Sequence, residues 1–159
     1  MLAALDSAVL DLVRSRDPDA APTRAVAAFS KLGEHGAIWF AIAGVGAAVD
    51  ADGRPGYVKA IKTVGAAFVA NQVVKQTVRR KRPAPAEQHV ETPTQLSYPS
   101  THAATCFAGA RALEGLLPAG PVYALATGLA LSRLHLGVHY PSDTVAGAVL
   151  GTAVAELAR

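Results

Sequence analysis

Three short motifs between Lys75 and Asp143 bring together residue types that could do chemistry. They are Lys75 to Pro83, Pro99-Ser100-Thr101-His102, and Ser132 to Asp143. They supply lysine and arginine, which bind phosphate oxygens as a point charge and as a planar fork. They also supply histidines and an aspartate, which can act as nucleophile, acid and orienting group. Together these residue types predict chemistry on a phosphoryl group.

The third motif pairs a histidine with a carboxylate. His139 and Asp143 are four residues apart at an expected helix start. The carboxylate can therefore accept from one imidazole nitrogen and leave the other free to attack. His102 arrives from a different segment and can protonate a leaving alkoxide. No spacing of histidine, cysteine and carboxylate argues for a metal site, so we expect neither a metal nor another cofactor.

The other motif residues suit an anion. Lys75, Arg82 and Arg133 are fixed cations, and Ser100 and Thr101 are good N-cap candidates. The last apolar segment also begins beside the third motif, so two helix N-termini would point into the cluster and favour phosphate. A lone histidine is more often a bonded core residue. The convergence of three cations, two histidines and a carboxylate favours a functional site instead.

The segments that must position these motifs have the apolar periodicity of helices. Residues 1–17 place leucine and valine on one face and charges on the other, which predicts an amphipathic helix. After a loop marked by Pro18 and Pro22, about five apolar segments follow without strand alternation: Gly36–Val49, Ala60–Val74, Thr101–Leu117, Pro121–Leu131 and Thr144–Ala158. Residues 83–99 are a long irregular loop. The sequence predicts one all-α domain, a helical bundle over residues 1–159.

Alternating helix direction should bring the three motifs to one end of this bundle. The loop over residues 83–99 joins the end of one apolar segment to the start of the next, so Lys75 and Arg82 lie near the second motif. The hairpin of the following two segments returns Ser132 and Arg133 to the same end. The last segment then departs from that end. We therefore expect a single polar site.

The composition fits a bundle in a membrane and a bundle in water. The chain has 159 residues, of which 51% are hydrophobic and 17% charged, which excludes a disordered protein. Its apolar runs use small side chains that let helix backbones approach closely. A membrane-spanning helix needs about 20 mostly apolar residues, and several of these runs are shorter. From the residues alone, both a spanning bundle and a soluble one fit.

The net charge of +3 comes mainly from the basic run between Lys75 and Pro83. No helix-turn-helix, zinc-finger or aromatic-rich signature surrounds this run, so we expect no nucleic acid partner. Arg79, Arg80 and Lys81 are interpreted as surface residues that attract anionic lipid. No basic residue precedes the first apolar stretch, so we expect no cleaved secretory signal.

The order and spacing of the three motifs resemble the signature of the type 2 phosphatidic acid phosphatase superfamily. The matching residues run from Lys75 to Asp143, nearly half of the chain. The resemblance implies a helical-bundle phosphatase in which His139 is the nucleophile and forms a phosphohistidine. It also implies that Asp143 orients this histidine and that His102 is the general acid. The residues implied to hold the phosphoryl oxygens are Lys75, Arg82, Ser100 and Arg133.

One position departs from the family pattern. The third residue of the middle motif is usually glycine, and it is Thr101 here. Threonine keeps the backbone N–H but does not easily adopt a positive φ, so we expect the local turn and the phosphate geometry to differ. His135 fills no motif position and is interpreted as supporting. His35 and His89 are interpreted as surface or loop residues.

The resemblance implies an integral protein of a bacterial cell membrane that removes phosphate from a lipid phosphate or diphosphate. Isoprenoid, phosphatidyl and decaprenyl-phosphoribose substrates all fit, and the alanine-rich composition singles out the last as a particular candidate. The side of the membrane that the site faces is left open. One alternative is a soluble acid phosphatase or haloperoxidase-like enzyme with the same pocket. A second is a non-enzymatic membrane scaffold, which should lack one of the chemical residues.

Overall fold

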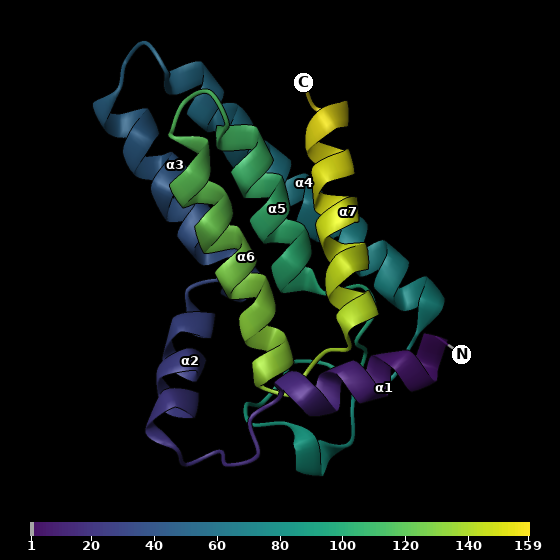
Figure 1. Ribbon diagram of the computed structural model, residues 1–159. Coiled ribbons are helices and arrows are strands. Elements are labelled where there is room, and N and C mark those ends of the chain that lie inside the picture. Colours follow the sequence, from purple (N-terminus) through teal and green to yellow (C-terminus); the bar gives the residue numbers. More distant parts are fainter. Residues whose placement is uncertain (1) are drawn as a thin grey trace.

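The computed structural model describes residues 2–159 and shows seven α-helices and two short 3₁₀-helices in them (Figure 1). In chain order these are α1 (Leu2–Val13), α2 (Ala21–Lys31), η1 (Glu34–Gly36), α3 (Ala37–Val49), α4 (Arg54–Val78), η2 (Pro85–Glu87), α5 (Thr101–Leu113), α6 (Ala119–His135) and α7 (Pro141–Leu157). Strand pairing among these residues is limited to isolated bridges, such as that of Lys81 with Leu96. The predicted all-α class is confirmed.

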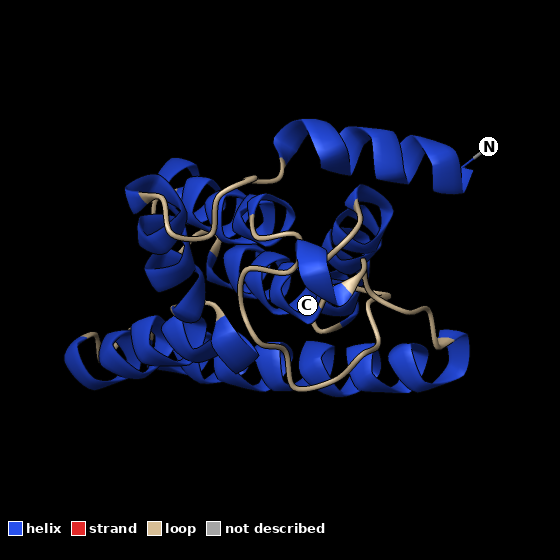
Figure 2. Ribbon diagram, turned by 90° about the horizontal axis from the view of Figure 1, so that it is seen from below, coloured by secondary structure: helices blue, strands red, loops and turns tan. Residues whose placement is uncertain are grey.

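Helices α3 to α7 form the bundle, and α5 is its central helix. It packs against α4, α6 and α7 and is buried along most of its length. The core contains buried side chains from four helices, α3 to α6, among them Trp39, Leu113 and Leu129. Helix α1 lies across one end of the bundle (Figure 1), and Figure 2 shows the loops gathered at this end. The same end carries all three motifs.

Helices α5 and α7 touch through their backbones at two glycines. A Cβ atom at Gly147 would lie 2.4 Å from the Ser100 carbonyl oxygen, and one at Gly151 would lie 2.0 Å from that of Ala104. Only a residue without a side chain fits at such a contact. We call this contact the glycine seam. It fixes the spacing of the two helices that begin at the second and third motifs.

Helix α2 occupies a stretch where the sequence predicted a loop. Pro22 lies in its first turn, where the N–H that proline lacks would have no helical partner anyway. Its fully buried side chains are polar, Thr23 and Ser30, and Phe29 packs against the core while only partly buried. The loop prediction was therefore wrong, because Pro22 lies in the first turn of a helix and does not interrupt one.

Other helix boundaries differ from the apolar runs at their polar ends. Helix α4 spans Arg54–Val78 rather than Ala60–Val74, because residues outside its apolar run continue the helix. Helix α5 stops at Leu113 rather than Leu117, where the chain turns through Gly115 with a φ of 92°. Apolar periodicity marks the buried part of a helix, and helix ends often project beyond it.

One stretch of the described chain, Ala21–Val49, is long and apolar enough to be a candidate membrane span, with a mean hydropathy of 1.3. It is bent at His35, whose φ is 51°. Large apolar side chains also cover the outer faces of the bundle. Those more than half exposed on α3, α4 and α7 include Val45, Val49, Val69, Val73, Val145 and Val149.

Candidate active site

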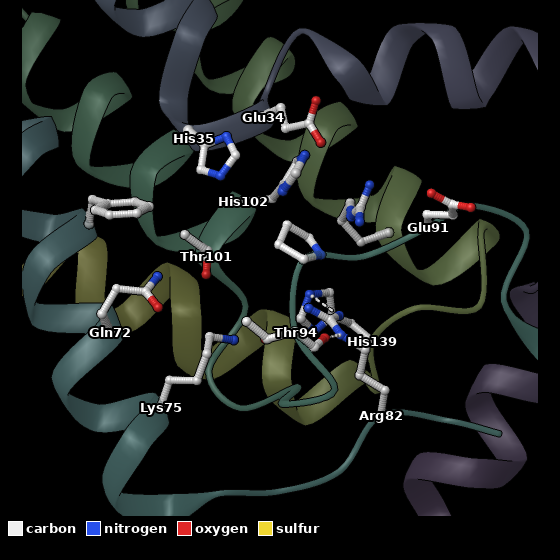
Figure 3. Close-up of a pocket in the computed structure, with 13 residues that line it drawn as sticks. Glu34, His35, Gln72, Lys75, Arg82, Glu91, Thr94, Thr101, His102 and His139 are labelled. Atoms are coloured by element: carbon white, nitrogen blue, oxygen red, sulfur yellow. Dashed lines mark hydrogen bonds between the residues drawn. The ribbon is translucent and has the colours of Figure 1, made fainter. Parts of the chain in front are cut away.

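A cavity of about 120 Å³ lies where the three motifs meet (Figure 3). Six of the eight residues predicted for the site line it, namely Lys75, Arg82, Thr101, His102, Arg133 and His139. The other two, Ser100 and Asp143, are fully buried and are not among the lining residues. The predicted residues thus converge on one cavity, with two of them behind its wall.

The imidazole of His139 is oriented with Nε2 toward Arg82. Nη1 of Arg82 lies 3.0 Å from Nε2. A guanidinium can only donate, so Nε2 carries the lone pair and the proton of the neutral ring is on Nδ1. Nδ1 lies 3.6 Å from Oδ2 of Asp143 and has no hydrogen-bond partner among residues 2–159. This orientation is the one that an Nε2 nucleophile requires.

Asp143 is held by donors other than the histidine. Its Oδ2 accepts from the backbone N–H of Tyr140 at 2.9 Å, and its Oδ1 accepts from Nη1 of Arg80 at 2.9 Å. These contacts explain why the expected hydrogen bond to His139 is longer than a bonding distance. They also correct the interpretation of Arg80 as a surface residue, because Arg80 forms an ion pair with a fully buried carboxylate.

The charge state of His139 follows from its surroundings. Burial, together with the positive charges of Arg82 and Arg133, holds the pKa of His139 well below its usual range. The ring is therefore neutral at physiological pH, as a nucleophile must be. Burial also lowers the pKa of Arg82 to about 10, which still leaves its guanidinium charged at neutral pH.

His102 and Arg133 share a partner that the sequence did not indicate, Ser30 of α2. Nε2 of His102 lies 3.1 Å from the Ser30 carbonyl oxygen. A carbonyl only accepts, so Nε2 carries a proton and Nδ1 is the nitrogen left for chemistry. Nη1 of Arg133 donates to Oγ of Ser30 at 2.8 Å, whereas Nε of Arg133 has no partner among the described residues. This buried Nε is a donor available to a phosphoryl oxygen.

Lys75 contacts the backbone that precedes α5. Its ammonium donates to the carbonyl oxygens of Pro99 at 2.9 Å and of Leu96 at 3.2 Å. Burial of this side chain is nearly complete, with 2% exposed. Lys75 therefore holds the loop that leads into the second motif, and it also lines the cavity.

The second motif starts a helix directly. Oγ of Ser100 caps α5 by accepting from the N–H of Ala103 at 3.4 Å, and Thr101 is the first helical residue. The hydroxyl of Thr101 donates to Oδ1 of Asn71 at 2.8 Å. Asn71 is fully buried and also donates to the Pro99 carbonyl. The threonine that replaces the usual glycine is thus accommodated by a hydrogen bond into the core and not by a positive φ.

The remaining histidines lie in different places. His35 is exposed, as its interpretation as a surface residue predicted, and it lines the cavity together with Glu34. His135 is not among the cavity residues. His89 bonds through Nε2 to the Ser15 carbonyl at 2.7 Å and so ties the long loop to the segment after α1. Among residues 2–159, no group of three or more histidine, cysteine or acidic side chains could hold a metal ion.

Comparison with known proteins identifies the class. The sequence profile of the PAP2 superfamily matches residues 56–159, and the chain belongs to this superfamily, as its three motifs predicted. It is accordingly a phosphoric monoester hydrolase. Among its relatives, the decaprenylphosphoryl-5-phosphoribose phosphatase of Mycolicibacterium smegmatis is 39% identical over 122 residues, which are 76% of this chain and 68% of the relative. That of Mycobacterium tuberculosis is 42% identical over 135 residues, 80% of this chain and 73% of the relative.

Two solved structures share the fold. A transmembrane PAP2-type phosphatidylglycerolphosphate phosphatase from Bacillus subtilis aligns with a TM-score of 0.78 and 23% identity, over 99% of this chain and 84% of that one. Aquifex aeolicus LpxE aligns with a TM-score of 0.75 and 20% identity, over 97% of this chain and 94% of that one. The arrangement of helices is therefore that of known PAP2 enzymes.

We predict that Arg82→Gln moves the acidic limb of the pH profile of kcat/KM to higher pH. Loss of the Arg82 charge lets the pKa of His139 rise, although burial still lowers it. Because the histidine must be neutral to attack, activity is lost as the pH falls through this pKa. Substrate ionisation is the same for both proteins and cancels in the comparison. Lys81→Gln, which removes an exposed neighbouring charge, should leave the limb in place, and an unmoved limb in Arg82→Gln would contradict the assignment.

Proposed function

We propose that residues 1–159 act as one catalytic domain that hydrolyses a lipid phosphomonoester through a phosphohistidine at Nε2 of His139. The observation that carries this proposal is the lone pair of Nε2, directed at Arg82 in a cavity lined by three cations. Lys75, Arg82 and Arg133 supply charge and N–H donors for the phosphoryl oxygens. The buried Nε of Arg133 is the donor with no competing protein partner among the described residues.

The reaction needs two proton transfers. Nε2 of His139 attacks phosphorus as the P–O bond to the leaving group breaks. His102 acts here in its doubly protonated form, with a second proton on Nδ1 in the substrate complex, and gives this proton to the departing alkoxide. Water then attacks the phosphohistidine, His102 takes a proton from that water, and inorganic phosphate and free His139 result. Nε2 of His102 keeps its own proton on the Ser30 carbonyl throughout. Ser100 supports this arrangement by capping the helix that bears His102.

The polar lining of the cavity favours a leaving group with hydroxyls over a second phosphate. Glu34, Glu91 and Gln72 line it together with the cations (Figure 3). Carboxylate and amide oxygens accept hydrogen bonds from hydroxyl groups, whereas two carboxylates repel an additional phosphate. This chemistry fits a phosphorylated sugar on a lipid better than a diphosphate, in agreement with the activity for which the mycobacterial relatives are named. We therefore propose a polyprenyl-phosphoribose type of substrate.

We further propose that the bundle of α3 to α7 is embedded in a bacterial cell membrane with the cavity at the interface. The exposed valines of the bundle form an apolar outer surface, which lipid would cover. Several helices are shorter than the usual spanning segment of about 20 residues. The bent stretch Ala21–Val49 is the candidate span in the described chain. A cavity at the bundle end would then receive a phosphate headgroup whose lipid chain stays in the bilayer.

We predict that His139→Ala and His102→Ala fail in different ways, measured in the presence of a chelator. His139→Ala should form no phosphoenzyme with any substrate. His102→Ala should lose about 10²- to 10⁴-fold on a lipid phosphate, the usual contribution of a general acid. The loss should shrink for p-nitrophenyl phosphate, whose leaving group departs without a proton. Equal impairment on both substrates, with chemistry rate-limiting, would show that His102 only positions phosphate.

We predict that the double variant Glu34→Gln/Glu91→Gln gains about 3- to 10-fold in kcat/KM for an isoprenoid diphosphate relative to a lipid-linked sugar phosphate. The expected gain is modest because each exposed charge contributes less than about 1 kcal/mol. Asp52→Asn removes a charge from the turn between α3 and α4, outside the lining of this cavity, and is the matched control. An unchanged ratio in the double variant would remove the argument against a diphosphate.

We predict that the protein stays with the membrane fraction after high-salt and alkaline washing. Helices with apolar outer faces and internally bonded backbones are stable in a bilayer, whereas a peripheral protein is released by these treatments. The measurement is the fraction of protein in the pellet by immunoblot. Complete release into the supernatant would favour the soluble phosphatase alternative.

A further inference from the structure

A series of charged contacts connects the N-terminal helix to the catalytic histidine. Asp6 of α1 is buried, with 4% exposed, and its Oδ2 accepts from Nη2 of Arg80 at 2.8 Å. Nη1 of the same guanidinium donates to Oδ1 of Asp143 at 2.9 Å. The other oxygen of Asp143 faces Nδ1 of His139 at 3.6 Å. The contacts therefore run without a break from Asp6 through Arg80 and Asp143 to His139.

Asp6 also holds the first turn of α7. Its Oδ1 accepts from the backbone N–H of Ser142 at 3.0 Å, and its Oδ2 accepts from the Ser142 hydroxyl. The first N–H groups of a helix have no partner within the helix, and a negative charge beside them is favourable. Burial alone would raise the pKa of Asp6, but the hydrogen bonds from Ser142 and Arg80 lower it. A charged Asp6 thus anchors α1 to the turn that bears Asp143.

Arg80 is built to bridge the two acids. Its planar fork places one nitrogen on each carboxylate, which the single ammonium of a lysine cannot reproduce. The guanidinium also stacks on the Tyr140 ring, 4.1 Å from its centre. Among the ion pairs of residues 2–159, Arg80 is the one lysine or arginine bonded to Asp143. Arg80 does not line the cavity, so this role requires no contact with substrate.

We propose that Arg80 is a positioning residue for phosphoryl transfer and that Asp6 of α1 keeps Arg80 in place. Arg80 pairs with the carboxylate of Asp143 and keeps it directed at Nδ1 of His139. Attack by Nε2 puts positive charge on the imidazole ring, and the fixed carboxylate stabilises that charge, as an aspartate does behind a catalytic histidine. This inference rests on the proposed function, because it assigns Arg80 to the step in which the phosphohistidine forms.

The test measures the rate of phosphoenzyme formation in a single turnover of detergent-solubilised full-length protein, with p-nitrophenyl phosphate as the probe. Arg80→Gln should lose about 10- to 100-fold, the loss typical when a group that orients an active-site ligand is removed. Asp6→Asn should lose less, and Arg80→Lys should recover part of the rate. The inhibition constant of inorganic phosphate should change by less than about 2-fold, because the cavity is intact.

A double-mutant cycle separates positioning from general stability. In the Asp143→Asn background, Arg80→Gln should lower the rate of phosphoenzyme formation by less than about a further 2-fold, since the carboxylate charge that Arg80 orients is already gone. Unchanged rates in Arg80→Gln, or equal losses in both backgrounds, would overturn the proposal. Thermal unfolding is measured for each variant. Where Arg80→Gln does not fold, the cycle of Asp6→Asn with Asp143→Asn provides the same comparison.

Arg79→Gln is the matched control for these measurements. Arg79 is the exposed neighbour of Arg80, and no side-chain hydrogen bond or ion pair joins it to the described part of the chain. Its variant should form phosphoenzyme at the wild-type rate. Wild-type protein without any phosphoenzyme would instead contradict the proposed function. The two failures are therefore distinguishable.

Discussion

The active-site end of this bundle depends on the need of buried cations for acceptors. Lys75 and Arg133 are buried and Arg82 is partly buried in one small region, and an uncompensated buried charge is costly. Backbone carbonyls meet much of this need. Arg82 bonds to the carbonyl oxygens of Thr94 and Val138, and Lys75 bonds to those of the segment before α5. The long loop is therefore ordered by the same side chains that would bind phosphate.

Backbone carbonyls offer these cations only partial negative charge. A bound phosphate dianion would offer them full negative charge. Nη1 of Arg82, which now donates to His139, would then turn to a phosphoryl oxygen and release Nε2 for attack. In the proposed mechanism, substrate binding would therefore free Nε2 of His139 through one exchange of hydrogen bonds. This exchange would cost little because the guanidinium is already oriented and partly desolvated.

The sequence predicted the parts of the site that depend on motif spacing and helix direction. His139, His102 and the three cations meet at one end because successive helices alternate, and this was readable from the apolar segments. Ser30 and Asp6 were not predicted, because each acts through a side chain that a distant helix delivers by tertiary packing. Arg80 was misread, because a basic run is usually solvated and nothing in its local pattern indicates two buried carboxylate partners.

The glycine seam between α5 and α7 limits how the enzyme can adapt to other substrates. Because the two helices touch through their backbones, no side chain at this contact can be replaced by a smaller one. The cavity therefore cannot be widened by substitutions between these two helices. Room for a bulkier headgroup has to come from the wall formed by η1 and the long loop, which bring Glu34 and Glu91 to the cavity. Substrate preference can therefore change through insertions and substitutions in this wall, while the spacing of His102 and His139 stays constant.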